Sequence, residues 1–327
     1  MTAACHHAPV TSSTGPAVLA TYSRSGFIEG SHAGHAVVVG ADGEVLRSWG
    51  DPAHVIFPRS SNKPAQATAM VESGLDVSSR LLALAASSHS GEDVHLEAVD
   101  ELLALAGLPT AALQTPADYP YSPTARDAWI RAGRAPESCA MTCSGKHAAM
   151  LLTCVLNDWP TDTYRDPAHP LQQAIRSTLE RLSGESVGNV GVDGCGAPVM
   201  SLSLAGLARM ASRVVQGTVG SAERRVGDAM VAYPEMVGGT GREVTTMMRA
   251  VPGLVAKDGA EGVYVAALPD GTGIAVKAED GAERASQVAL ASVLVSCGVD
   301  RAALADVIEV PMLGGGAPVG AVVARIP

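Results

Sequence analysis

The sequence predicts an α/β protein of the α+β type, in which an antiparallel sheet from N- and C-terminal strands packs with helices beside a mainly helical lobe. Short alternating or β-branched runs, interrupted by Gly and Asp, lie at both ends of the chain. The middle instead shows apolar residues at the i, i+3, i+4 spacing of helices. We therefore expect one domain over residues 1–327, with a sheet lobe at about 17–60 and 251–327 and a helical lobe at about 61–250.

Turn signals define the predicted strands. Residues 35–40 and 44–49 flank Asp42-Gly43, and Asp-Gly is a strong hairpin signal. Residues 263–268 and 273–278 form a second alternating pair, and a last strand near 319–326 follows a glycine-rich loop at 314–316. Helical spacing is present at 81–86, 97–105, 148–156, 171–182, 199–214 and 283–295.

The composition excludes several classes of protein. With Lys+Arg 23 and Asp+Glu 33, the net charge is −10, which argues against a nucleic-acid-binding protein. Hydrophobic residues make up 47% of the chain and charged residues 17%, so a large core can form and disorder is not expected. Aromatic residues make up only 3%, which leaves Ala, Val, Leu and Met to fill that core.

The apolar runs, the N-terminal residues and the cysteines indicate the cellular compartment of the protein. No apolar run reaches the roughly 18 residues of a membrane span, so no membrane association is expected. Residues 1–10 contain no Lys or Arg ahead of an apolar stretch and do not resemble a secretory signal, which predicts a cytoplasmic protein. The six cysteines are then expected to be thiols, metal ligands or core residues rather than disulfides.

The first candidate for chemistry is the Ser-x-x-Lys spacing of Ser60 and Lys63 in the segment FPRSSNKP. A serine hydroxyl becomes a nucleophile when a base removes its proton, and a lysine one helical turn later can reach it. The same spacing also suits a helix-capping serine with a solvated lysine.

Two further segments that could carry chemistry follow Ser60 and Lys63, and the order of the three segments along the chain is informative. Ser88 lies in the polar loop ASSHSGE, and Lys257 lies in Lys257-Asp258-Gly259, just ahead of the strand predicted at Val263. The order Ser-x-x-Lys, second serine, Lys-x-Gly is that of serine β-lactamases and penicillin-binding proteins. Alternatively, Ser88 caps a turn and Lys257 is a surface lysine. Lys277, in the next strand, rivals Lys257.

The fourth candidate joins Cys143, Lys146 and His147 of CSGKH with Cys195 of DGCG. Two thiolates and one more donor suit zinc, although the spacing departs from ordinary structural zinc sites. The residues alone leave three interpretations open: buried thiols in turns, a metal site, or a nucleophilic cysteine beside His147.

Seven segments together resemble the asparaginase II family of Rhizobium etli type, from about Tyr22 to the C-terminus and in the family's order. They are Arg24 to His32, FPRSxxKPxQ at 57–66, AxSHxGExxH at 86–95, CSGKH at 143–147, DGC at 193–195, PEMVxG at 234–239 and KxGAEGV at 257–263.

This resemblance implies hydrolysis of the side-chain amide of L-asparagine on a fold similar to serine β-lactamases and glutaminases. It implies that Ser60 with Lys63 and Ser88 with Lys257 form two Ser-Lys tandems, Ser60 being the nucleophile. Further implied roles are substrate binding by Arg59, Asp193 and His147, and zinc binding by Cys143, Lys146 and Cys195.

A homodimer is also implied. Two other functions remain open: a glutaminase or β-lactamase-like amide hydrolase of the same fold, and a non-catalytic protein that binds zinc or an amino acid. The departures from the family pattern are Ala86-Ser87, where a cysteine-alanine pair is more usual before Ser88, and Ser90, where an asparagine is more usual.

Overall fold

The computed structural model describes residues 15–327, so the leader analysis of residues 1–10 lies outside the described chain. The described residues divide into two compact units. The sheet unit comprises the described residues up to Ser61 together with Leu202–Gln216 and Thr246–Pro327. The helical unit comprises Asn62–Ser201 and Gly217–Thr245. Helix α10 (Glu243–Ala250) crosses the boundary between them.

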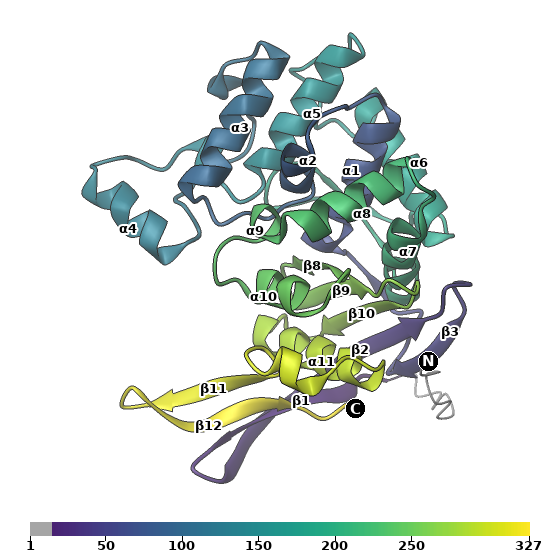
Figure 1. Cartoon of the computed structure of the whole chain (residues 1–327), viewed down its shortest axis with the longest axis vertical. Helices are drawn as coiled ribbons and strands as arrows, with labels where there is room; N and C mark the ends of the chain where they lie inside the picture. Colours follow the sequence, from purple (N-terminus) through teal and green to yellow (C-terminus); the bar gives the residue numbers. More distant parts are fainter. Residues whose placement is uncertain (1–14) are drawn as a thin grey trace. The chain divides into compact units, whose positions relative to one another are not determined.

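The sheet unit contains an 8-stranded antiparallel sheet in the order β11-β12-β1-β2-β10-β9-β8, with β3 paired to β2 (Figure 1). Its main strands are β1 (Ala17–Arg24), β2 (Phe27–Val39), β3 (Val45–Trp49), β8 (Val255–Gly259), β9 (Val263–Ala267), β10 (Gly273–Ala278), β11 (Glu309–Gly314) and β12 (Ala317–Ala324). Strands from both ends of the chain therefore share one sheet, which confirms the predicted fold class.

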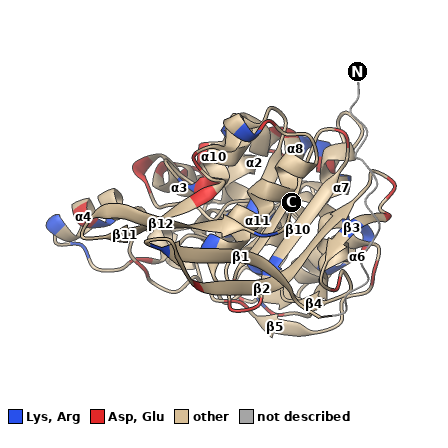
Figure 2. Cartoon of the chain, turned by 90° about the horizontal axis from the view of Figure 1, so that it is seen from below, with Lys and Arg blue, Asp and Glu red and all other residues tan. Residues whose placement is uncertain are grey.

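Helices α7 (Leu204–Gln216) and α11 (Glu283–Ser296) pack on this sheet. Every residue of β9 is buried, so both faces of that strand are covered. In Figure 2, β1, β2 and β10 are drawn almost entirely as uncharged residues, and their charged members are Arg24, Glu29 and Lys277. The interior of the sheet unit is correspondingly aliphatic, as the low aromatic content predicts.

The start of the helix predicted at 199–214 is wrong. Pro198–Met200 forms β6, which pairs with β5 (Val190–Val192), and Leu202–Ser203 forms β7, which pairs with β4 (Val55–Ile56). Helix α7 begins only at Leu204 and belongs to the sheet unit, not to a helical lobe that runs to residue 250. Gly273 permits this packing, because a Cβ there would lie 2.3 Å from the Ala208 carbonyl oxygen of α7.

The helical unit contains α1 (Lys63–Glu72), α2 (Ser79–Ala85), α3 (Asp93–Ala106), α4 (Pro123–Arg131), α5 (Ser144–Leu156), α6 (Pro170–Ser183), α8 (Ala222–Ala232) and α9 (Pro234–Val237). The helices predicted at 81–86, 97–105, 148–156 and 171–182 correspond to α2, α3, α5 and α6. Among residues 15–327, no helix has both the length and the apolar character that a bilayer span requires.

Candidate active site

Ser60 lies in a short 3-10 helix, Arg59–Asn62, that leads directly into α1. Arg59, immediately before it, adopts a left-handed backbone with φ of 53°. This conformation costs a non-glycine residue about 1–2 kcal/mol, and such strain concentrates at functional sites. The segment that carries the predicted nucleophile is therefore held in a conformation that the sequence alone would not favour.

Strand β8 explains the Lys-x-Gly pattern. A Cβ on Gly259 would lie 2.8 Å from the Pro58 carbonyl oxygen and 3.1 Å from the Ser61 nitrogen. Only glycine lets the strand approach the Ser60 segment this closely. The sequence placed Lys257 just ahead of a strand, but Lys257 lies inside β8, the terminal strand of the sheet.

Lys257 is fully buried, so the alternative of a surface lysine is wrong. Its Nζ donates to the backbone oxygen of Asp258 at 2.9 Å and to the Asp258 carboxylate at 2.5 Å. The rival Lys277 is half-buried in β10 and donates to the Glu261 and Ala278 carbonyls. Arg59 lies 3.7 Å from the Glu261 carboxylate. Two features favour Lys257 over Lys277 as the second candidate lysine: its burial and the close approach of its strand, at Gly259, to the Ser60 segment.

Lys63 is the buried centre of the candidate site in the helical unit. Its Nζ donates to the Ser87 carbonyl at 2.5 Å, to Ser88 Oγ at 2.9 Å and to Cys143 Sγ at 3.0 Å. The side chain is 1% exposed, so the alternative of a solvated lysine is wrong. These three acceptors match the three N–H donors that a lysine side chain can offer. The structure thus joins Lys63 to Ser88, a serine assigned by sequence to the other tandem.

The Ser88 loop is held by a second segment, PEMVGG at 234–239. The Ser88 amide donates to the Val237 carbonyl, and Ser90 Oγ donates to the Gly238 carbonyl. Thr240 donates to Glu92 through both its amide and its hydroxyl. These hydrogen bonds hold the two segments together. Ser90, which stands where the family more often has asparagine, therefore contributes to anchoring this loop.

Cys143, Lys146 and Cys195 form a buried cluster in the helical unit. Lys146 Nζ donates to Cys195 Sγ at 3.3 Å, and all three side chains are almost fully buried. The hydrogen bond from Cys195 lowers the pKa of Cys143 well below its usual range, and Lys63 and Lys146 act in the same direction against burial. The bond with Cys143, together with burial, raises the pKa of Cys195. The shared hydrogen bond and the two lysines thus make Cys143 the more acidic of the two thiols.

These three side chains fit a zinc ion. A tetrahedral ion with Zn–S of about 2.3 Å and Zn–N of about 2.1 Å separates its nitrogen and sulfur ligands by about 3.6 Å. The 3.3 Å contact between Lys146 and Cys195 is close to that separation. Burial lowers the pKa of Lys146, but the negative sulfurs outweigh burial and the pKa is raised overall. Lys146 must therefore give up a proton before it can ligate a metal.

His147 and Asp193, two predicted substrate-binding residues, are neighbours in sequence of Lys146 and Cys195 and have different contacts. His147 is fully buried on α5, and its Nδ1 lies 2.7 Å from the Tyr164 hydroxyl. Burial, reinforced by Lys146 and Lys63, lowers the pKa of His147 well below its usual range, so the ring is neutral. The Asp193 carboxylate accepts the Gly194 amide at 2.8 Å in the turn that carries Cys195, and its charge acts on Lys146.

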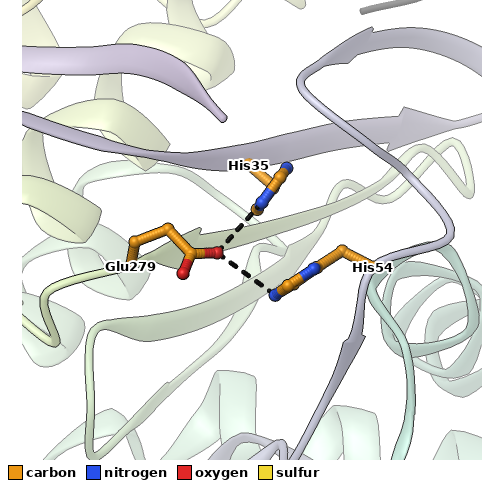
Figure 3. Close-up of side chains that lie close together, drawn as sticks. All are labelled: His35, His54 and Glu279. Carbon is orange, nitrogen blue, oxygen red and sulfur yellow. Dashed lines mark hydrogen bonds and ion pairs between the residues drawn. The ribbon is translucent and has the colours of Figure 1, made fainter. Parts of the chain in front are cut away.

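A second group of metal-ligating side chains lies in the sheet unit: His35, His54 and Glu279, with ligand atoms within 4.8 Å of one another (Figure 3). Glu279 Oε1 lies 3.0 Å from His35 Nε2 and 3.2 Å from His54 Nε2, and the two rings stack. His35 Nδ1 accepts the Asp51 amide at 2.9 Å, which places the ring proton on Nε2. That proton points to Glu279, so His35 is a hydrogen-bond donor here and not a preformed metal ligand. The sequence did not single out this group, which anchors the chain ahead of the Ser60 segment.

The His35 contacts predict a loss of stability in acid. Burial and the neighbouring His54 lower the pKa of His35 below 6.5. A histidine with a depressed folded-state pKa contributes stability that is complete above about pH 6.5 and declines as the pH falls below that value, by at most about 1.4 kcal/mol per pH unit. In His35→Asn, the amide oxygen replaces Nδ1 as acceptor without titrating. Urea unfolding at pH 7.5 and 5.5 should show a smaller acid loss in this variant, and equal losses would contradict the assignment. The stability of His35→Asn should still decline in acid, because burial also lowers the pKa values of His89 and His95.

The family model for L-asparaginase II matches residues 20–324. The chain belongs to this family. Membership supports a hydrolase, specifically an amidohydrolase, and implies a small-molecule amide as substrate. No curated protein sequence matches the chain.

Three solved structures are similar to this L-asparaginase II family member. A β-lactamase from Mycobacterium bovis is 17% identical, with 81% of this chain and 94% of that chain covered and a TM-score of 0.46. Mglu in its glutamate form is 16% identical, with 80% and 60% covered and a TM-score of 0.35. EstCE1, a hydrolase with promiscuous acyltransferase activity, is 13% identical, with 88% and 92% covered and a TM-score of 0.36.

Proposed function

We propose that this chain is an L-asparaginase that hydrolyses the side-chain amide of L-asparagine to L-aspartate and ammonia. The observation that carries the proposal is the buried hydrogen bond from Lys63 Nζ to Ser88 Oγ, 2.9 Å long. It joins a residue of each serine-containing motif inside a member of an amidohydrolase family. Burying a lysine side chain costs free energy unless its donors are paired. Buried clusters of titratable groups such as this one occur often at functional sites.

In the proposed reaction, Ser60 Oγ attacks the carboxamide carbon. Ser60 and Lys63 are three residues apart on a continuous 3-10 to α-helical segment, a spacing that places side chains on one face. In this step the amine form of Lys63 takes the Ser60 proton as the Ser60 oxygen bonds to the carboxamide carbon. Lys63 then passes that proton through the Ser88 hydroxyl to the leaving nitrogen, the C–N bond breaks, and ammonia departs. Water cleaves the resulting aspartyl ester and regenerates Ser60.

The remaining residues receive supporting roles in this proposal. The family resemblance assigns Lys257 to the second tandem, with Ser88; Lys257 is buried on β8, where its Nζ donates to Asp258. The guanidinium of Arg59 suits recognition of the substrate α-carboxylate, because its planar fork pairs with two oxygens. Asp193 suits the α-ammonium group. Cys143, Lys146 and Cys195 would hold a zinc ion, which when bound would orient the substrate as a Lewis acid. A cytoplasmic homodimer stays a prediction.

Ammonia release tests the proposal with a matched pair of serine variants. Ser88→Ala should lower kcat for L-asparagine by roughly 10²–10⁴-fold, the usual contribution of a proton-transfer group. Ser87→Ala is the control, because the neighbouring Ser87 Oγ is buried and has no hydrogen-bond partner among residues 15–327, while the Ser87 backbone carbonyl accepts from Lys63. Equal activity of the two variants would contradict the role of Ser88. L-glutamine and a chromogenic lactam, assayed in parallel, distinguish the glutaminase and β-lactamase-like alternatives. Absence of turnover with all three would favour the binding protein.

A further inference from the structure

Tyr164 is a fully buried tyrosine that no motif marks. Its hydroxyl has two partners in the described chain: it lies 2.7 Å from His147 Nδ1 and accepts the Gln114 amide at 3.1 Å. Its ring meets that of His147 edge-on. A buried hydroxyl against a buried imidazole fixes which ring nitrogen carries the proton.

The placement of protons follows from counting donors and acceptors. The Tyr164 oxygen already accepts the Gln114 N–H, so the hydroxyl proton is left to donate, and His147 Nδ1 is the acceptor within reach. His147 then carries its own proton on Nε2. In the opposite arrangement, Nδ1–H would donate to the Tyr164 oxygen. The tyrosine hydroxyl proton and the Nε2 lone pair would then both lack a hydrogen-bond partner in the described chain. One buried unpaired group costs less than two.

The tyrosine is itself held firmly. Arg165 Nε donates to Gln114 Oε1 at 2.6 Å, and Gln114 Nε2 donates to the Asp162 carbonyl at 2.7 Å. The guanidinium of Arg165 lies over Gly196, where a Cβ would approach within 2.1 Å of it. The chain of contacts therefore runs from the Cys195 turn through Arg165, Gln114 and Tyr164 to His147.

His147 Nε2 is buried and has no hydrogen-bond partner in the described chain. We propose that Tyr164 is a positioning residue that fixes His147 in the Nε2–H tautomer, so that this N–H is reserved for an oxygen acceptor of the bound substrate. This inference rests on the proposed function for the identity of the substrate. An ammonium group has no lone pair, so His147 binds a carboxylate or carboxamide oxygen and not the α-amino group.

The same tautomer separates His147 from the metal cluster. A metal binds the lone pair of an imidazole nitrogen, and Nε2 carries a proton instead. His147 therefore does not add a fourth protein ligand to Cys143, Lys146 and Cys195.

Long-range ¹H–¹⁵N spectra of protein labelled with [¹⁵N]histidine test the tautomer without any substrate, with His147 assigned by its loss in His147→Gln. We expect the Nε2–H pattern for His147 in the native chain and a change toward Nδ1–H or exchange in Tyr164→Phe. A native His147 in the Nδ1–H form, or one unchanged by Tyr164→Phe, would overturn the proposal.

Kinetics and ligand binding test the consequence. Tyr164→Phe should raise the KM for L-asparagine and the Kd for L-aspartate by about tenfold, equivalent to one lost hydrogen bond to a charged group. His147→Gln keeps an N–H near the Nε2 position and should retain most of the affinity. Adding Tyr164→Phe to His147→Gln should then have no further effect.

An equal loss from Tyr164→Phe in both backgrounds would make Tyr164 merely structural and would overturn the proposal. If L-asparagine is not hydrolysed and L-aspartate still binds with the expected dependence on Tyr164, the proposed function fails and the inference stands. If L-aspartate does not bind the native chain, the ligand assignment is overturned even when the spectra show the Nε2–H tautomer.

Discussion

Replacing Lys63 by methionine lowers kcat for L-asparagine by about 10³-fold or more and lowers the free energy of unfolding by roughly 2–4 kcal/mol. Methionine fills a similar volume but can neither carry a proton nor donate to the three acceptors around Lys63. Cys143 Sγ loses its hydrogen bond from Lys63 Nζ, 3.0 Å away, at a place where both side chains are buried. Catalysis and stability therefore fall together.

A double variant separates the two effects. Removing the sulfur in Lys63→Met/Cys143→Ala takes away the group that lost this hydrogen bond, so part of the lost stability should return while turnover stays absent. Urea unfolding and ammonia release measure the two quantities on the same preparations. Turnover by Lys63→Met within tenfold of the native rate would exclude Lys63 as the base.

A single methyl group on Gly259 should be nearly as damaging to catalysis. In Gly259→Ala, the new Cβ would lie 2.8 Å from the Pro58 carbonyl, which is backbone and cannot turn aside. Either β8 or the Ser60 segment must shift, and displacement of reacting groups by about 1 Å costs on the order of 10²-fold in rate. We expect kcat to fall by about that factor, with a loss of stability of about 1–3 kcal/mol from overpacking.

Gly314→Ala is the matched control in the same unit. Its Cβ would contact two methyl groups of the Val319 side chain at 3.1 Å, which can adjust. This variant should keep native kcat and most of the native stability. If Gly259→Ala were as active as Gly314→Ala, the close approach of β8 would not position the nucleophile.

Much of the fold could be predicted because its signals are local. Asp42-Gly43 and the turn at 269–272 sit between paired strands, and helix α11 starts where its apolar spacing starts. Strand β11 was missed because Pro311 argues against a strand. Proline is tolerated there because β11 is the edge of the sheet. The start of α7 was misplaced because apolar strand residues at 199–203 continue the helical spacing.

The site was predictable to the extent that its residues occur in motifs. Ser60, Lys63, Ser88 and Lys257 were predicted from the spacing and order of their motifs. The bond between Lys63 and Cys143 spans 80 positions, and nothing in either motif indicates it. Tyr164 has no motif at all; a single buried tyrosine has meaning only once its hydroxyl is seen between His147 and Gln114. The left-handed Arg59 is equally invisible, since glycine would be the usual residue there.

The most direct test of the account is rapid acid quenching of the enzyme during turnover of L-asparagine, followed by mass spectrometry of the peptide that contains Ser60. We expect a peptide heavier by one aspartyl group attached at Ser60, which is absent in Ser60→Ala; that variant should also release no ammonia. Ammonia release that persists in Ser60→Ala, or an adduct on Cys143 or Cys195 instead, would contradict a serine acyl-enzyme and move the chemistry to the sulfur cluster.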